Sequence, residues 1–250
     1  AAHSLKIKTF IHEQNSISGK ANLFLSKKVD LIGVSFKSSL KEYPKEKTIF
    51  TGNPCSENAL KIVEAKKSDF GLSETKKLVL FVMGSLGSSR VNDFLIKTMS
   101  LFNGKDYEIL YVTGTGEYEK LKNIKLPNNV KMVPYIENMT RIMKKTDVLV
   151  SRAGASTLSE IIALQVPSIL IPSPYVPDNH QFKNAMDLVN KDAAVLIEEK
   201  DLKGDILIQK IDDMINNEDF LSKMKSNLNE LSIPESATKI YNTIKEIIDR

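Results

Sequence analysis

Short apolar runs alternate along this chain with segments whose apolar residues recur at helical spacing. Several runs are apolar at consecutive positions, as in 78–82 (Leu-Val-Leu-Phe-Val), which is typical of a parallel strand buried between two helix layers. Strands are predicted at residues 8–12, 29–35, 48–51, 78–83, 108–112, 130–134, 148–151, 168–171 and 194–197. Helices are predicted at residues 20–28, 88–102, 117–123, 138–145, 156–164 and 180–190. This alternation predicts an α/β fold with a doubly wound parallel sheet.

The pattern also predicts how the chain is divided. After Leu202 only helices are expected, and the last, at 235–250, has isoleucines on one face. A cluster of turn residues at 51–54 (Thr-Gly-Asn-Pro) follows a strand and predicts a domain boundary. Only about 50 residues precede it, whereas a complete lobe of this kind usually takes roughly 100–150 residues. The first lobe is therefore expected to be incomplete.

Composition narrows the class of protein. The hydrophobic content of 42% suffices for a sizeable core, and the single cysteine, Cys55, excludes an internal disulfide. The net charge of +4 is a mild bias toward anionic partners, but no basic block is interleaved with aromatic residues, so nucleic acid is not an expected partner. No apolar run approaches the roughly 20 residues that span a bilayer, and residues 1–6 lack a signal-peptide layout. A soluble or peripheral membrane protein is expected.

Two strand-to-helix junctions have the composition of an anion site. The first, at 83–89 (Met-Gly-Ser-Leu-Gly-Ser-Ser), has glycines that let the backbone approach a ligand, and free N–H groups at the helix start favour an anion. An ordinary tight turn capped by Ser88 or Ser89 is the alternative. The second, at 151–160, is rich in small residues and hydroxyls, which suits a diphosphate. Glu160 lies about one turn into the helix, where its carboxylate reaches a ribose diol or, alternatively, closes a capping box.

Two further loops are rich in hydrogen-bonding groups. Residues 172–181 form a proline-rich loop beyond a strand end, where ligands of open α/β sheets bind, and it ends in Asp-Asn-His-Gln. Residues 12–15 (His-Glu-Gln-Asn) follow another strand directly. The alternatives are a surface loop that caps the next helix and a structural His–Glu pair. The sequence has no zinc-type Cys/His spacing, no Walker-type loop and no Gly-x-Ser-x-Gly elbow, so neither a metal nor a cofactor is expected.

Taken in this order, the four segments resemble the MurG family of UDP-N-acetylglucosamine transferases. The similarity runs from Thr9 to about Ile197. The most specific match is 152–160 (Arg-x-Gly-Ala-x-Thr-x-Ser-Glu), and the others are 12–15 with Gly19 and Asn22, the linker at 51–54, the glycine loop at 84–87, and Gln181 with Asn184 and Ala185.

The resemblance implies a GT-B fold that transfers N-acetylglucosamine with inversion from UDP-GlcNAc to the muramyl C4 hydroxyl of lipid I, which gives lipid II. It places the enzyme in the cytoplasm, peripheral on the inner face of the membrane, with an anionic membrane surface as a partner. Residues 1–54 would be part of the acceptor lobe, 55–232 the donor-binding domain, and 233–250 a helix packed back on the first lobe. By resemblance the site residues are Asn15 and Gln181 at the sugar, Ser85 at the diphosphate, Ile136 at the uracil, Glu160 at the ribose, and Ala155, Ser156, Thr157, Leu158 and Ser159 around phosphate.

The sequence departs from the family pattern in two places. The family's first lobe opens with another glycine-rich loop that carries a histidine proposed in catalysis, and this loop has no counterpart here. An arginine that follows the linker in the family is Ser56 in this chain, which removes a bidentate anion donor. His12 and Glu13 are the remaining candidates for a base. Two alternatives to transfer onto lipid I are a non-catalytic UDP-sugar-binding remnant and a related GT-B enzyme, either with another lipid acceptor or an epimerase.

Overall fold

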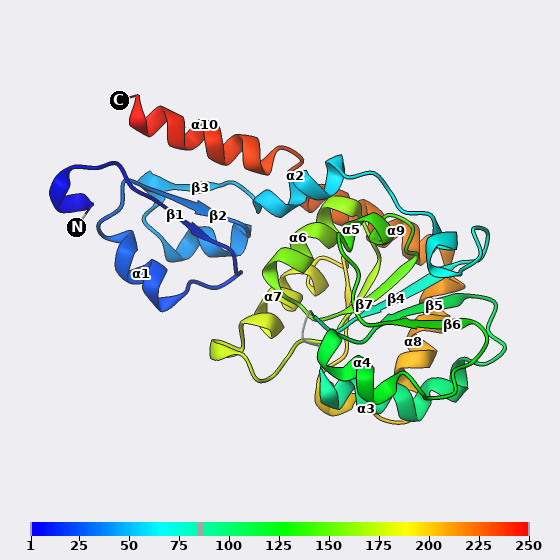
Figure 1. Ribbon diagram of the computed structural model, residues 1–250. Coiled ribbons are helices and arrows are strands. Elements are labelled where there is room, and N and C mark those ends of the chain that lie inside the picture. Colours follow the sequence, from blue (N-terminus) through cyan, green and yellow to red (C-terminus); the bar gives the residue numbers. More distant parts are fainter. Residues whose placement is uncertain (1, 85–87, 250) are drawn as a thin grey trace.

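The computed structural model describes residues 2–84 and 88–249, which form two parallel sheets joined by a helical linker (Figure 1). The smaller sheet has the order β1-β2-β3 and the larger the order β6-β5-β4-β7-β8-β9. The strands are β1 Phe10–Glu13, β2 Leu31–Val34, β3 Thr48–Phe50, β4 Leu78–Val82, β5 Glu108–Val112, β6 Val130–Val133, β7 Val148–Ser151, β8 Ser168–Leu170 and β9 Val195–Leu196. All nine predicted strands are present in the described part of the chain, each within a few residues of its predicted bounds.

Helices connect and cover these strands. The α-helices are α1 Lys20–Ser26, α2 Pro54–Lys61, α3 Ser89–Thr98, α4 Thr115–Leu121, α5 Thr140–Met143, α6 Ala155–Leu164, α7 His180–Val189, α8 Ile206–Ile215, α9 Glu218–Leu231 and α10 Ser236–Ile248. The 3-10 helices are η1 His3–Leu5, η2 Lys37–Glu42, η3 Lys45–Lys47, η4 Lys67–Phe70, η5 Met99–Phe102, η6 Pro177–Asn179 and η7 Glu199–Asp201. No helix in residues 2–84 and 88–249 is both long and apolar enough to cross a bilayer.

The larger sheet has the strand order of a dinucleotide-binding fold. In chain order its strands are 3-2-1-4-5-6, and the direction of winding reverses between β4 and β7. β4 lies in the centre because it is apolar on both faces: Leu78, Val79, Leu80 and Phe81 are fully buried. The loops after β4 and β7 therefore leave toward opposite faces of the sheet, and the crevice between them is where ligands of such folds bind.

The linker contains a helix, α2, which begins directly after the turn residues at 51–53. Asn53 is the N-cap of α2, its side chain accepts a hydrogen bond from the Cys55 N–H at 3.1 Å, and Pro54 occupies the first turn. Asn-Pro is a helix-start signal as well as a turn signal, because proline fits the first helical position, which needs no N–H donor. The helix that begins at Pro54 was not among the predicted helices.

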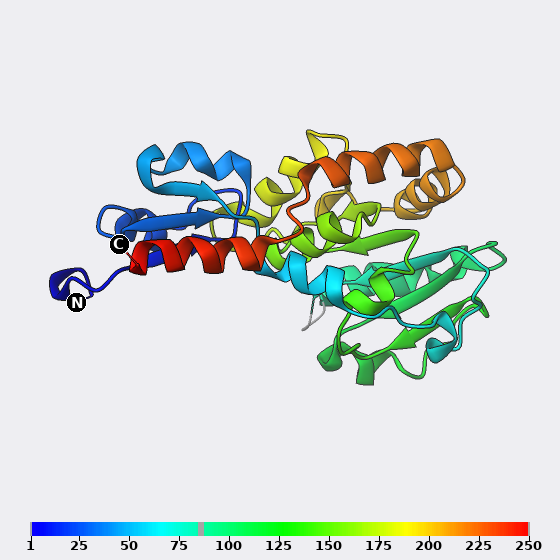
Figure 2. The same cartoon turned by 90° about the horizontal axis from the view of Figure 1, so that it is seen from above.

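The last helix lies beside the linker and the small sheet (Figure 2). The Ser236 hydroxyl donates to the Asn53 carbonyl at 2.6 Å, and the Thr238 N–H donates to the Glu57 carboxylate at 2.8 Å. Gly52 has φ +71, and a Cβ there would lie 3.1 Å from Cβ of Ile233. Both the backbone conformation and the close approach therefore require glycine at this junction.

Candidate functional site

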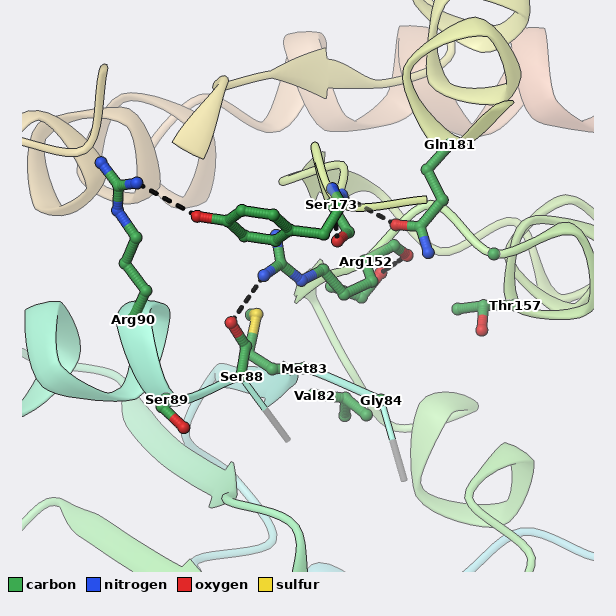
Figure 3. A pocket seen from close by; sticks show the side chains of 13 residues that line it. Val82, Met83, Gly84, Ser88, Ser89, Arg90, Arg152, Thr157, Ser173 and Gln181 are labelled. Carbon is green, nitrogen blue, oxygen red and sulfur yellow. Dashed lines mark hydrogen bonds between the residues drawn. The ribbon is translucent and has the colours of Figure 1, made fainter. Parts of the chain in front are cut away.

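Two adjoining cavities open over the carboxyl ends of the central strands. The larger, of about 630 Å³, is bordered by the loops after β4, β7 and β8 and by α7 (Figure 3); its lining residues include Met83, Gly84, Ser88, Arg90, Arg152, Gly154, Ser173, Tyr175 and Gln181. The smaller, of about 210 Å³, extends toward β5 and β6; its lining residues include Gly114, Tyr135, Ile136, Asn138, Met143 and Glu160. Both are lined by Val82, Gly84, Ser151 and Thr157. One elongated ligand therefore fits across the point where the winding reverses.

Helix α6 begins at this shared wall without a side-chain cap. Its N-cap is Gly154, and the first bond within the helix runs from the Leu158 N–H to the Gly154 carbonyl at 2.9 Å. Within the described chain, the N–H groups of Ala155, Ser156 and Thr157 have no protein acceptor. These amides and the positive end of the helix dipole form a site for an anion.

The N-cap residue of α3 is engaged by an arginine, so the start of that helix has no side-chain cap. Ser88 is the N-cap residue of α3, but its hydroxyl makes no capping bond and accepts from Nη2 of Arg152 at 2.6 Å. Arg152 is buried and also donates to the Ile171 carbonyl at 3.0 Å and to the Glu199 carboxylate at 2.6 Å. Figure 3 shows its guanidinium hydrogen-bonded to Ser88 in the lining of the cavity. One side chain therefore fixes three loops at the carboxyl edge of the sheet.

Glu160 projects into the smaller cavity without a partner. Burial raises the pKa of its carboxyl to about 7, and within the described residues no hydrogen bond reaches it. The capping-box alternative does not hold, since neither Ser156 nor Thr157 is the N-cap. A half-buried carboxylate with free acceptors beside a pocket lined by Ile136 suits a ribose diol next to a base.

Gln181 is held at the other end by the loop after β8. Its Oε1 accepts a hydrogen bond from the Ser173 N–H at 2.9 Å, so its NH2 group remains to donate into the larger cavity. Asp178 and Asn179 have φ of 54 and 51, and the Asn179 side chain at the N-cap of α7 makes no capping bond. The interpretation of this loop as a simple helix cap is therefore not supported.

The segment after β1 contains an organising carboxylate. Glu13 is buried and accepts hydrogen bonds from the N–H groups of Asn15 and Gly19 and from the side chains of Asn22 and Tyr43. Burial opposes its ionisation, but these donors outweigh burial and hold the pKa of Glu13 below its usual value. A carboxylate so engaged is a poor base, so the geometry argues against the predicted catalytic role of Glu13.

His12 ties β1 to the linker. Its Nε2 lies 3.0 Å from both the Thr51 hydroxyl and the Gly52 carbonyl, and burial lowers its pKa despite the opposing effects of Gly52 and Glu13. Nε2 must carry a proton that it donates to the Gly52 carbonyl. His12 lines neither cavity. These contacts favour a structural role, and a role of His12 as a base stays a prediction.

Glu13→Gln is expected to lower the free energy of unfolding at pH 7 by about 1.5–3 kcal/mol, as for hydrogen bonds to a charged group. The depressed pKa means that this stabilisation is present above pH 4.5 and is lost as the pH falls through the folded-state pKa. Urea unfolding at pH 7 and pH 4 should therefore show the gap between the two proteins narrowing at low pH. The exposed Glu46→Gln is the control, and a gap that is independent of pH contradicts the organising role.

The remaining predicted residues are placed as follows. The Leu158 side chain is packed in the core and its N–H is used within α6, while the Ser159 hydroxyl donates to the Ala155 carbonyl at 2.8 Å. Neither has a group left for phosphate, so the predicted phosphate contacts reduce to Ala155, Ser156 and Thr157. Ser85, predicted at the diphosphate, lies outside the described residues. The roles of Arg152 and Glu199 were missed: arginine in the 152–160 motif was a signal for the first, and nothing marked the second.

The chain is similar in sequence to known glycosyltransferases. Residues 78–243 match the glycosyltransferase family 28 C-terminal domain. The chain is 42% identical over 252 residues to the UDP-N-acetylglucosamine–N-acetylmuramyl-(pentapeptide) pyrophosphoryl-undecaprenol N-acetylglucosamine transferase of Bacillus pumilus, which covers 99% of this chain and 69% of that protein. The protein of the same name from Halalkalibacterium halodurans is 44% identical over 255 residues, with the same coverage.

Solved structures extend the comparison to the fold. The crystal structure of MurG from Acinetobacter baumannii superposes with a TM-score of 0.77 at 23% identity, covering 98% of this chain and 68% of that one. A putative UDP-N-acetylglucosamine 2-epimerase from Listeria monocytogenes gives 0.73 at 13% identity, covering 99% and 70%. These likenesses confirm the predicted GT-B-like α/β fold. Together with the sequence matches, they establish that the chain belongs to the MurG family, within glycosyltransferase family 28.

Proposed function

We propose that this chain binds UDP-GlcNAc and transfers its N-acetylglucosamine, with inversion, to the muramyl C4 hydroxyl of lipid I, which yields lipid II for peptidoglycan. One observation carries the proposal: the free amides at the start of α6 form the wall shared by two cavities, one with Glu160 and Ile136 and the other with Gln181. Diphosphate at this wall puts the nucleoside on one side and the sugar on the other. The names of the close relatives supply the acceptor.

Stabilisation of the leaving group is the chemistry that these residues offer. When the acceptor hydroxyl attacks the anomeric carbon, a new C–O bond forms, the hydroxyl proton is released to solvent, and the bond to the diphosphate oxygen breaks, so that UDP leaves with an additional negative charge. The N–H groups of Ala155, Ser156 and Thr157 are pre-oriented toward that charge, and so is the positive end of α6. In the proposal Glu160 holds the ribose and Ile136 borders the uracil, while Gln181 and Asn15 contact the sugar.

In the proposal, the unit built on each sheet binds one of the two substrates. We assign residues 55–232 to the donor and 1–54 to the acceptor lobe, with α10 in the segment 233–250 packed back toward that lobe. Ser56, which stands where the family has arginine, supports a structural use of this position: its hydroxyl donates to the Ser159 carbonyl at 3.3 Å and joins α2 to α6. In this chain the linker therefore offers packing instead of a bidentate anion donor.

We further propose a peripheral position on the inner, cytoplasmic face of the membrane. Leu23, Phe24 and Leu25 of α1 are exposed large apolar side chains, and Lys27 and Lys28 next to them are exposed as well. Apolar residues bordered by lysines suit the surface of an anionic bilayer. Sedimentation with anionic but not with zwitterionic vesicles is the result that this proposal expects.

The function is tested by measuring UDP release and product formation with UDP-GlcNAc and a lipid I analogue. We expect UDP release that requires the acceptor and stops when the acceptor is the 4-deoxy muramyl analogue. Release with diacylglycerol instead of lipid I would indicate a different lipid acceptor, and isomerisation of UDP-GlcNAc without acceptor would indicate an epimerase. Calorimetric binding of UDP-GlcNAc without any turnover would identify a binding remnant. Each of these three results overturns the proposed transfer.

A further inference from the structure

Asn184 is a buried amide that hydrogen-bonds loops from both sheets. It lies in α7, one turn after Gln181, and is 0% exposed. Its Oδ1 accepts from the Ser16 N–H at 2.8 Å, and its Nδ2 donates to Oδ1 of Asn15 at 3.0 Å and to the Ala153 carbonyl at 3.3 Å. Figure 1 shows α7 at the junction between the small and the large sheet. The side chain therefore joins the two units by two of these bonds, those to Ser16 and Asn15.

These bonds fix the orientation of the Asn15 amide. Because the Asn184 nitrogen is a donor only, it must meet the oxygen of Asn15, and the NH2 group of Asn15 faces elsewhere. Among residues 2–84 and 88–249, that NH2 group makes one long contact, 3.4 Å from Oε1 of Glu13. An NH2 group has two N–H bonds, so at least one remains to donate to a ligand.

The same amide reaches the phosphate junction. Ala153 directly precedes Gly154, the N-cap of α6, so its bond to Asn184 links the Asn15 loop to the free amides of that helix. Gln181 lines the larger cavity and lies three residues before Asn184, which puts both on neighbouring positions of one helix face. One face of α7 therefore carries Gln181 and, through Asn184, holds Asn15. These are the two residues assigned to the sugar.

We propose that Asn184 is a positioning residue for the sugar half of the donor, which it does not touch. It acts by orienting Asn15 and by holding the Asn15 loop at a fixed place relative to the α6 amides. The inference rests on the proposed binding of UDP-GlcNAc. The nucleotide half is held by the large-sheet unit alone, through Ile136, Glu160 and α6, so its affinity should not depend on Asn184.

The test compares the Kd of UDP-GlcNAc with the Kd of UDP by calorimetry in wild type and Asn184→Asp. Aspartate has the same shape but no N–H, so it repels the oxygens of Asn15 and Ala153. We expect the ratio of the two Kd values to rise about five- to tenfold, the loss of one oriented hydrogen bond. An unchanged ratio in a variant that still binds UDP normally would show that Asn184 has only a structural role and overturn the proposal. Asn190→Asp, at the exposed end of α7, is the matched control.

A double-mutant cycle with Asn15→Ala separates positioning from general packing. If Asn184 acts through Asn15, Asn184→Asp should leave the Kd ratio unchanged in the Asn15→Ala background, whereas additive effects overturn the proposal. Normal UDP binding shows that a variant is folded; should Asn184→Asp fail this check, Asn184→Ser is measured by the same criteria. If wild type itself does not bind UDP-GlcNAc, the proposed function fails, which is a distinct outcome.

Discussion

Replacing Glu160 by alanine is expected to weaken UDP-GlcNAc binding by about 1.5–3 kcal/mol at pH 8, the range for hydrogen bonds to a charged group. The carboxylate lies in the smaller cavity with no protein partner in the described chain, so a ribose diol would supply its only strong donors there. Titration calorimetry measures the loss directly. Glu230→Ala on the exposed surface of α9 is the matched control. Unchanged affinity of Glu160→Ala would remove the ribose role from this residue.

The raised pKa adds a pH signature to the same experiment. With a pKa of about 7, roughly 9% of the carboxyl is ionised at pH 6 and roughly 91% at pH 8, so binding to the ionised form alone would strengthen about tenfold over this interval. UDP-GlcNAc is the better probe than UDP, because its diphosphate diester has no proton that titrates there. Glu160→Gln should bind weakly and equally at both pH values. A pH profile that is the same in both proteins contradicts the assignment.

As the pH rises and Glu160 ionises, donor binding should strengthen but the stability of the fold should fall. The folded protein holds a proton on Glu160 between pH 4.5 and about 7 that the unfolded chain has released, so this group lowers stability as the pH rises through that window. Glu160→Gln should therefore melt at a higher temperature than wild type at pH 8 while binding donor less well. A residue that lowers stability but strengthens ligand binding is typical of a buried charge kept for function.

The sequence was informative where one segment contains both strand and helix signals. The apolar run at 148–151 and the small residues of 152–157 predicted a strand-to-helix junction, and the strand order places this junction at the reversal point of the sheet. Local pattern sufficed because the ligand groups there are the backbone amides of one helix start. The resemblance added residue roles that periodicity alone left open between capping and binding.

Contacts between distant segments were not predictable in this way. Glu199 lies in η7, and nothing in its neighbourhood indicated that it would be buried against Arg152, 47 residues earlier. Asn184 and Asn15 are 169 residues apart, and their bond depends on how the two sheets dock. The hydrogen bonds that engage Glu13 were not predictable for the same reason, since its partner Tyr43 comes from another segment. Tertiary packing decides which polar residues are engaged and which remain free.

Arg152 forms a clamp through its hydrogen bonds to Ser88, Ile171 and Glu199. This clamp gives the prediction with the largest expected effect on stability. Arg152→Ala leaves the Glu199 carboxylate, whose side chain is 2% exposed, without its main partner. Loss of one member of a buried ion pair typically costs about 3–5 kcal/mol in the free energy of unfolding. Arg90 offers only partial replacement, since it lies 3.6 Å from the other oxygen of Glu199 and is largely exposed. Urea unfolding at pH 7 measures the loss.

Two further variants separate the clamp's effect on stability from its effect on donor binding. The neutral pair Arg152→Met with Glu199→Gln should recover much of the lost stability, because no buried charge is left unpaired. It should not recover UDP-GlcNAc binding, since Ser88 and the Ile171 carbonyl would still lack the donor that joins the β4, β7 and β8 loops. Arg152→Lys keeps the charge but cannot make these bonds together, so it should resemble the neutral pair in binding. Two results would contradict this role: an unchanged midpoint of urea unfolding in Arg152→Ala, or full donor affinity in the neutral pair. Either would mean that the three loops hold their places without the arginine.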